Sequence, residues 1–314
     1  MQAVTFGEFG AADVLHVSDL PQPVAGPGEV LVRVAASTVN PTDILMRNGA
    51  QAGLMTDLQP PYLCGMEFSG TVEAGEGGTI AVGTPVIGVV NPRRPQGGAY
   101  AQFIVVPAAS VAPLSDAIDL VAAAAVPMNA LTAMMALDQV ELAAGDSLLV
   151  TGGTGILGGL VLQLAQLRGI RTLAAGRPDE HDLLSSLGAD VVLRRDEDLV
   201  TAVRAALPDG ADALIDTALI GQQISKAVRD EGCAVSLRRS HPIEDARLQV
   251  GYVAVTDGME DNVLLQRIAA HLDAGEITPR IAESGVFSYR DAVASHRMAE
   301  TGGVRGRVVL TFAD

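Results

Sequence analysis

One glycine-rich segment holds the residues whose types and spacing most clearly predict a chemical task. Residues 148–165 read as a short apolar run, then the pattern Gly153-x-Gly155-x-x-Gly158, then an amphipathic run. Between a strand and a helix, such glycines permit a tight turn, and the backbone N–H groups at the helix N-terminus attract a pyrophosphate. The alternative is a plain strand-to-helix turn without a ligand. We expect a dinucleotide to bind here, along Gly153, Thr154, Gly155, Ile156, Leu157 and Gly158.

The end of the next expected strand predicts which dinucleotide binds. A site for NAD has Asp or Glu about 20 residues after the glycines, whereas Gly176 and Arg177 stand in that position here. A guanidinium binds a 2′-phosphate with two hydrogen bonds, and a carboxylate would repel it. We therefore predict NADP(H), held by Gly176, Arg177 and, after the third strand, Arg194. Alternatively, Arg177 is a solvated loop residue, Asp179 or Glu180 binds the ribose, and Arg194 is a surface charge.

Two kinds of element must position this site. Residues 1–115 hold short segments between Gly and Pro turns, such as 29–35 and 84–90, which predict a compact β domain. From residue 147 onward, apolar strands alternate with helices, a pattern typical of a doubly wound parallel sheet. Strands are expected at 147–151, 171–175, 191–193, 213–216, 233–236 and 250–255, and helices at 117–125, 130–140, 155–168, 180–187, 199–207, 220–228 and 261–272.

Composition excludes several classes of function. The chain has 314 residues and a net charge of −16, so it should repel nucleic acids and anionic membranes. The two cysteines, Cys64 and Cys233, are too few for a four-thiolate zinc site, and the five scattered histidines show no ligand spacing, so no metal site is expected. No signal peptide or membrane span is recognisable, which favours a cytoplasmic protein.

Several short motifs resemble the zinc-independent quinone oxidoreductases of the medium-chain dehydrogenase/reductases, the zeta-crystallin-like family. In order, they are Asn40-Pro-Thr-Asp43, Gly65-Met-Glu67-Phe-Ser-Gly70, residues 82–88, residues 97–103, Leu131-Thr132-Ala133 and Gly306-Arg-Val-Val-Leu. The resemblance implies a GroES-like β-barrel domain at 1–115 and a Rossmann domain with a doubly wound parallel sheet at 116–255. Residues 256–314 then complete the Rossmann domain and return to the first domain. It also implies a homodimer.

The departures from the family pattern concern metal and proton chemistry. Zinc-dependent members have a cysteine where Val39-Asn40 stands and a histidine where Met66 stands, so zinc cannot polarise a carbonyl here. Many relatives place tyrosines where this chain has Leu45 and Gln51, so the usual phenolic proton donor is missing. Glu67 is then expected to be a structural acceptor of hydrogen bonds.

Two residues are expected beside the reacting groups. By resemblance, Thr132 faces the nicotinamide, and the Asn40 amide binds a carbonyl oxygen or the nicotinamide end; both are thus candidates for catalysis and for cofactor binding. Alternatively, Asn40 only forms the turn before Pro41. Asp43 is expected to orient Asn40 or to cap a helix rather than to transfer protons.

The resemblance implies an enzyme that transfers a hydride from NADPH to a small hydrophobic quinone, because a quinone accepts hydride readily and its product can take a proton from solvent. One alternative is NADPH-dependent reduction of the carbon–carbon double bond of an enone or enoyl intermediate in a biosynthetic pathway. Another is an NADPH-binding protein with little turnover.

Overall fold

The computed structural model describes residues 1–75 and 80–312, which form two compact units. Unit 1 combines Met1–Met128 with Met259–Asp314, and unit 2 is the continuous segment Asn129–Gly258. The division after Met128 falls in the first turn of α3 (Pro127–Gln139). Within the described residues, no helix is both long enough and apolar enough to cross a membrane.

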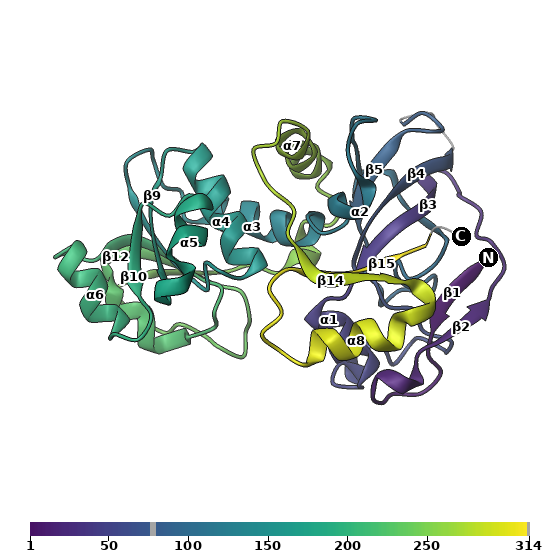
Figure 1. Cartoon of the computed structure of the whole chain (residues 1–314), viewed down its shortest axis with the longest axis horizontal. Coiled ribbons are helices and arrows are strands. Elements are labelled where there is room, and N and C mark those ends of the chain that lie inside the picture. The colour runs from purple at the N-terminus through teal and green to yellow at the C-terminus, as the bar shows by residue number, and fades with distance from the viewer. Residues whose placement is uncertain (76–79, 313–314) are drawn as a thin grey trace. The chain divides into compact units, whose positions relative to one another are not determined.

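Unit 1 is built on a mainly antiparallel sheet of β strands, as expected for a GroES-like domain. The strand order is β14-β15-β3-β4-β5-β7, with β6 also paired to β3, and a separate hairpin joins β1 and β2. Figure 1 shows that the purple and blue N-terminal strands share this sheet with β14 and β15 from the yellow C-terminal part. The strands are β1 (Gln2–Thr5), β2 (His16–Asp19), β3 (Glu29–Thr38), β4 (Glu67–Gly75), β5 (Pro85–Val89), β6 (Phe103–Pro107), β7 (Val111–Pro113), β14 (Ile281–Ser288) and β15 (Arg307–Thr311).

The helices of unit 1 lie against strands of this sheet or against one another. They are α1 (Pro41–Arg47), α2 (Leu120–Ala123), α7 (Asn262–Asp273) and α8 (Ala292–Glu300). Residues 116–128, which were expected in the second domain, belong to unit 1 in this division. The hydroxyl of Ser69 on β4 donates to the carbonyl of Leu120 at 2.5 Å, which ties α2 to the sheet.

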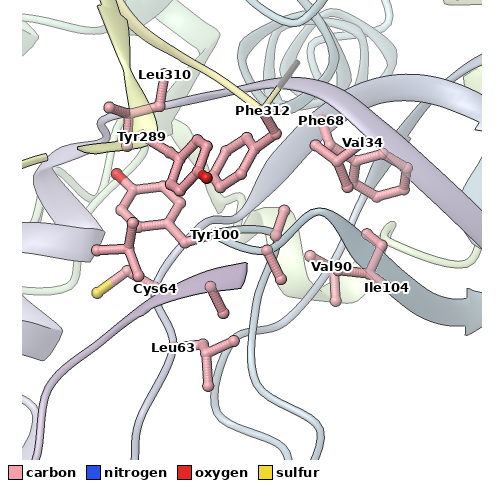
Figure 2. Close-up of a cluster of buried hydrophobic side chains, with 14 of the residues drawn as sticks. Val34, Leu63, Cys64, Phe68, Val90, Tyr100, Ile104, Tyr289, Leu310 and Phe312 are labelled. Atoms are coloured by element: carbon pink, nitrogen blue, oxygen red, sulfur yellow. The ribbon is translucent and has the colours of Figure 1, made fainter. Parts of the chain in front are cut away.

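The core of unit 1 is completed by residues from the C-terminal segment. The rings of Tyr289 and Phe312 stack with centroids 5.4 Å apart, and Figure 2 shows them together with Leu310, Cys64 and Tyr100. These side chains are all nearly inaccessible to water. Burial of this apolar surface therefore joins the two parts of unit 1, although they are far apart in the sequence.

Unit 2 has the predicted doubly wound sheet. The strand order is β10-β9-β8-β11-β12-β13, and every neighbouring pair is parallel. Strand β8 is buried along its whole length, as its apolar sequence requires. The strands are β8 (Ser147–Thr151), β9 (Arg171–Gly176), β10 (Val191–Arg194), β11 (Ala211–Asp216), β12 (Val228–Ser236) and β13 (Gln249–Tyr252), and the helices after α3 are α4 (Ile156–Leu167), α5 (His181–Ser186) and α6 (Leu199–Ala206).

One expected helix of unit 2 has a different form. The segment predicted as a helix at 220–228 is the 3₁₀ helix Gly221–Ala227, and β12 begins directly after it. Gly221 has a φ of +70°, which is outside the helical region, and Asp216 accepts the first N–H groups of the segment. The Asp216 carboxylate and the positive φ of Gly221 thus stabilise a tight turn. An α-helix would need a negative φ at this position.

Candidate functional site

The glycine pattern lies in the turn between β8 and α4, at the carboxyl end of β8. A Cβ on Gly158 would lie 2.3 Å from the carbonyl oxygen of Gly152, so only glycine lets α4 approach the strand this closely. Gly155 is the N-cap of α4 and gives the helix no side-chain cap. An N-terminus of this kind offers backbone N–H groups to an anion. The turn that carries Gly153, Thr154, Ile156 and Leu157 therefore fits the pyrophosphate of a dinucleotide.

A buried carboxylate fixes the edge of the sheet beside this turn. Asp216, at the end of β11, accepts hydrogen bonds from the Thr151 hydroxyl at 2.5 Å and from the N–H groups of Ile220 at 3.1 Å and Gly221 at 2.7 Å. The Thr151 hydroxyl oxygen accepts from the N–H of Ala218 at 3.0 Å. Because β8 and β11 flank the point where the strand order changes direction, these bonds shape the crevice where such sheets bind ligands.

The end of β9 shows how Gly176 and Arg177 are used. A Cβ on Gly176 would lie 2.6 Å from Cδ1 of Leu184, so a larger residue here would require the Leu184 side chain to shift. The Arg177 side chain is about half exposed and forms ion pairs with Asp179 at 3.3 Å and with Glu180 at 3.0 Å. Glu180 is almost fully buried and also accepts the Arg177 N–H at 2.9 Å. Arg177 is therefore positioned by two carboxylates rather than solvated alone.

The second candidate arginine, Arg194, lies on the neighbouring strand β10. Arg194 pairs with Gly176 in the β-sheet register, but its exposed side chain binds Asp196 at 2.7 Å and Glu197 at 3.2 Å. The backbone N–H of the following Arg195 donates to the Gly176 carbonyl at 3.0 Å. Both arginines thus lie beside the end of β9. Arg194 would have to break its ion pairs with Asp196 and Glu197 before it could bind a phosphate.

Unit 1 contains a buried polar cluster around Glu67. The Glu67 side chain is fully buried; its Oε1 accepts from the Arg307 guanidinium and from the Thr38 hydroxyl at 2.5 Å, and its Oε2 accepts from the N–H of Met128 at 2.8 Å. Glu67 is therefore an acceptor of hydrogen bonds, as predicted. Its charge is balanced by Arg307, which lies 240 residues away in the sequence.

Asn40 belongs to the same cluster. Its amide oxygen accepts from Arg307 at 2.6 Å, and its amide nitrogen donates to Thr38 at 3.2 Å and to Glu67 at 3.3 Å. The side chain is buried. The Asn40 amide thus forms its hydrogen bonds within unit 1. Its contact with an acceptor or a nicotinamide remains a prediction.

Asp43 orients Asn40, as expected. Its carboxylate accepts the Asn40 N–H at 2.8 Å at the start of α1, and also the Gly65 N–H at 2.7 Å. Burial raises the pKa of Asp43 to about 6, against the opposing effect of these donors and of Arg307. The residue therefore joins α1 to the loop before β4.

A second buried polar chain ties α1 to α8. Arg47 binds Glu300 and approaches Nδ1 of His296 at 3.5 Å, while Nε2 of His296 lies 3.1 Å from the Tyr100 hydroxyl. Because a guanidinium only donates, Nδ1 is the acceptor. The neutral ring therefore carries its hydrogen on Nε2, and this N–H donates a hydrogen bond to the Tyr100 oxygen. Burial and the nearby Arg47 lower the pKa of His296 to about 3. His296 is thus a neutral structural residue.

Thr132 lies on α3 of unit 2 and is nearly buried. One turn before it, the buried amide nitrogen of Asn129 has no hydrogen-bond acceptor among the described residues. Residues three apart lie on one face of a helix. This face therefore carries a hydroxyl together with an unsatisfied donor that a bound ligand could satisfy.

The residues that correspond to zinc ligands in zinc-dependent relatives cannot bind the metal. Val39 and Met66 are buried apolar side chains. Within residues 1–75 and 80–312, no three or more His, Cys, Asp or Glu side chains are grouped so that they could hold a metal ion. Neither position thus provides a thiolate or an imidazole ligand, and zinc independence remains a prediction.

The sequence patterns did not indicate the roles of Arg307 and Asp216. Arg307 stands in the quoted C-terminal motif, and a charged residue directly before an apolar run was the available signal. Asp216 ends an apolar strand in the same way, and a carboxylate at a strand end is a recognisable feature. The hydrogen bond between Gln51 and Arg93, at 2.8 Å, joins two loops and has no local signal.

Two family models match parts of the chain that together exceed half of its length. Residues 26–116 match the alcohol dehydrogenase GroES-like domain, and residues 187–310 match the zinc-binding dehydrogenase family. The first match lies within unit 1, and the second covers much of the doubly wound sheet and the return to unit 1.

Similar proteins extend over nearly the whole chain. It is 28% identical over 319 residues to a 2-methylene-furan-3-one reductase of Solanum lycopersicum, and this covers 99% of the chain and 79% of the relative. It is 27% identical over 321 residues to a chloroplastic NADPH-dependent alkenal/one oxidoreductase of Arabidopsis thaliana, with the same coverage. The solved quinone oxidoreductase of Coxiella burnetii superimposes with a TM-score of 0.86 at 26% identity, covering 100% of this chain and 99% of that one.

Proposed function

We propose, because the chain belongs to the medium-chain dehydrogenase/reductases, that it is an NADPH-dependent reductase that delivers a hydride to a quinone-type acceptor. The observation that carries the proposal is the turn between β8 and α4, where glycine at position 158 lets the helix approach Gly152 and where the N-terminus of α4 lies at the carboxyl end of a parallel strand. A second candidate, reduction of an enone carbon–carbon double bond, is favoured by the names of the tomato and Arabidopsis relatives.

The choice of NADPH rests on Arg177. Its partner Asp179 is exposed, and an exposed ion pair contributes little to stability, so a 2′-phosphate can replace Asp179 at small cost. Glu180 is buried and keeps the guanidinium in place from the other side. We therefore expect the phosphate to replace Asp179 as a partner of Arg177, while Glu180 keeps the guanidinium in position.

When bound, the reduced nicotinamide supplies the hydride. The N–H groups at the start of α4 would hold the pyrophosphate, and the Asn129 amide and Thr132 hydroxyl on α3 would hold a carbonyl group of the ligand. The acceptor gains the hydride, an electron pair moves to its carbonyl oxygen, and water supplies the proton. Glu67 and Arg307 keep the start of α1 rigid through Asn40.

We also propose a homodimer formed through the β13 edge of the unit 2 sheet. Strand β13 ends the sheet, and Gln249 and Val250 on it are exposed. An unpaired strand edge is a template for pairing with a second copy. A cytoplasmic location remains a prediction.

The test measures NADPH and NADH consumption with a simple para-quinone and a conjugated enone side by side, with product analysis. Quinone turnover with NADPH supports the proposal, and enone-only turnover moves the assignment to double-bond reduction. Arg177→Gln should weaken NADPH binding about tenfold, equivalent to about 1.4 kcal/mol, and leave NADH binding unchanged. Arg229→Gln, which removes another surface arginine of unit 2, is the control. Equal use of NADH by the wild type contradicts the role of Arg177, and tight NADPH binding without turnover supports a non-catalytic protein.

A further inference from the structure

A cavity of about 220 Å³ lies within unit 1, between the loop that precedes β4 and the loop that follows β5. Residues between Asp57 and Leu63 line it together with residues between Pro92 and Gly97. Pockets for drug-sized ligands measure about 300–1,000 Å³, so this cavity admits a smaller molecule, such as one ring with a substituent. All of its described lining residues belong to unit 1, so this unit alone forms the site.

Part of the cavity wall is apolar and rigid. Prolines and leucines form this part, namely Leu58, Pro61, Leu63, Pro92 and Pro95. Tyr62 also lines the cavity, and its ring stacks on Phe9 with centroids 5.8 Å apart. The Tyr62 N–H donates to the Phe6 carbonyl at 2.9 Å, and its carbonyl accepts from the Phe6 N–H at 3.0 Å. A ligand therefore meets apolar walls that need little ordering, which lowers the entropic cost of binding.

Arg94 adds a cation to this cavity. Its half-buried guanidinium donates from Nε to the Gly97 carbonyl at 2.9 Å and from Nη2 to the Val105 carbonyl at 2.7 Å. No carboxylate pairs with it in the described part of the chain, whereas Arg33 and Arg47 of the same unit each bind a glutamate. Burial lowers the pKa of Arg94 to about 10, because a charge is costly away from water. An anion bound in the cavity would offset this cost.

The Arg94 guanidinium has donors left for such an anion. The two carbonyl groups use one N–H on Nε and one on Nη2, so the remaining N–H groups lie on Nη1 and Nη2. Nη1 has no acceptor among the described residues, yet it is not sealed from solvent as the unpaired Nε atoms of Arg47 and Arg307 are. Two adjacent guanidinium nitrogens can hold both oxygens of one carboxylate. The free donors of Arg94 therefore suit a carboxylate ligand.

One acidic residue limits the charge that the ligand can carry. Asp57 is exposed and is the only acid among the described residues that line the cavity. A second negative charge on the ligand would increase its repulsion from Asp57, while Arg94 remains the only cation of the described lining. A phosphate monoester carries a charge of about −1.5 to −2 at neutral pH. A ligand with a single carboxylate therefore fits these charges better than a phosphate monoester does.

We propose that this cavity is a binding site for a small aromatic carboxylate. The carboxylate oxygens accept hydrogen bonds from Nη1 and Nη2 of Arg94, and the ring packs against the proline and leucine walls. The binding is reversible, and no bond is made or broken. The site shares no residue with the glycine turn after β8 or with the buried cluster around Glu67. The proposal therefore goes beyond the reductase function and does not depend on it.

Saturation-transfer NMR with benzoate tests this site on the whole chain, both free and saturated with NADP. The wild type should bind benzoate with a dissociation constant of about 1 mM in both states, and the neutral analogue benzamide at least about tenfold more weakly. Arg94→Gln should weaken benzoate binding at least about tenfold, because it removes the charged donors. Asp57→Asn should strengthen it about threefold, because it removes an exposed like charge. Arg33→Gln, which removes a surface arginine of unit 1 paired with Glu73, is the control and should leave the affinity unchanged.

Opposite effects of the two substitutions support the site, and the gain in Asp57→Asn cannot come from a loss of fold. An affinity for benzoate that either substitution leaves unchanged overturns the proposal, and so does binding that disappears when NADP is present. Absence of binding to the wild type at about 20 mM benzoate has the same meaning. Equal binding of benzamide refutes the role of the charge, and tighter binding of phenyl phosphate than of benzoate refutes the choice of a carboxylate. None of these outcomes uses NADPH turnover, so they are independent of the proposed function.

Discussion

Replacing Arg307 by Leu should destabilise unit 1 strongly, because it leaves the Glu67 carboxylate buried without its cation. Glu67 is fully buried and retains only neutral donors, from Thr38, Asn40 and the Met128 N–H. Removing one partner of such a buried pair costs about 3–5 kcal/mol, whereas replacing both by apolar residues is often neutral. The double variant Glu67→Met with Arg307→Leu should therefore recover most of the loss. Total stabilities of about 5–15 kcal/mol make the single loss easy to measure.

The assay is urea unfolding followed by tyrosine fluorescence. Three of the four tyrosines, Tyr62, Tyr100 and Tyr289, lie in unit 1, so the signal reports mainly on this unit. Arg33→Leu, which removes an exposed ion pair with Glu73, is the matched control and should cost less than about 1 kcal/mol. A loss below about 1 kcal/mol for Arg307→Leu, or a double variant that loses as much as the two single variants together, would refute this account of the pair.

The remaining predictions concern the glycine turn and the buried histidine. Gly158→Ala should weaken NADPH binding at least about tenfold, because its Cβ would lie 2.3 Å from the Gly152 oxygen; titration of NADPH fluorescence measures this, with Gly7→Ala, which meets open space, as the control. The pKa of His296 is lowered to about 3 in the folded chain, so the unfolded chain takes up a proton first as the pH falls. This residue therefore reduces the stability as pH falls from about 6.5 toward 3, by up to about 1.4 kcal/mol per pH unit. Asp43, raised to about 6, acts in the opposite direction between about pH 6 and 4, since the folded chain then holds the extra proton. His296→Asn should therefore become relatively more stable than the wild type in urea as pH falls from 6 to 4, and an unchanged difference between the two proteins would contradict the assignment.

Sequence patterns predict the sheet of unit 2 well, because its strands are short apolar runs whose neighbours follow at regular intervals. Ser147–Thr151 was expected and found with the same bounds, since burial on both faces requires every residue to be apolar or small. The expected helix at 220–228 was wrong in type, because the Asp216 carboxylate accepts the N–H groups of Ile220 and Gly221, and Gly221 has a positive φ that an α-helix does not contain.

The candidate site shows a sharper limit. Asn40 was singled out for its amide, but this amide is bound by Arg307, 267 residues away, and no local pattern indicates such a partner. Arg177 was expected to meet a phosphate, and its carboxylate partners were visible in the sequence as Asp179 and Glu180, yet only their burial distinguishes the exposed one from the one that is fixed. The sequence therefore indicates which residues have side chains suited to a ligand, whereas it does not indicate which charged residues pair with them across the fold.

The long-range pairing of Glu67 has a consequence for how the chain is made. Unit 2 is one continuous segment, so during synthesis it can fold as soon as its last strand has left the ribosome. The sheet of unit 1 lacks β15 until residues 307–311 emerge, and until then Glu67 has no cation and the core has no Phe312. A ribosome that stops before this strand would thus release a protein with a finished nucleotide-binding half and an unfinished barrel. Such a product should be a substrate for chaperones or proteases rather than a partly active enzyme.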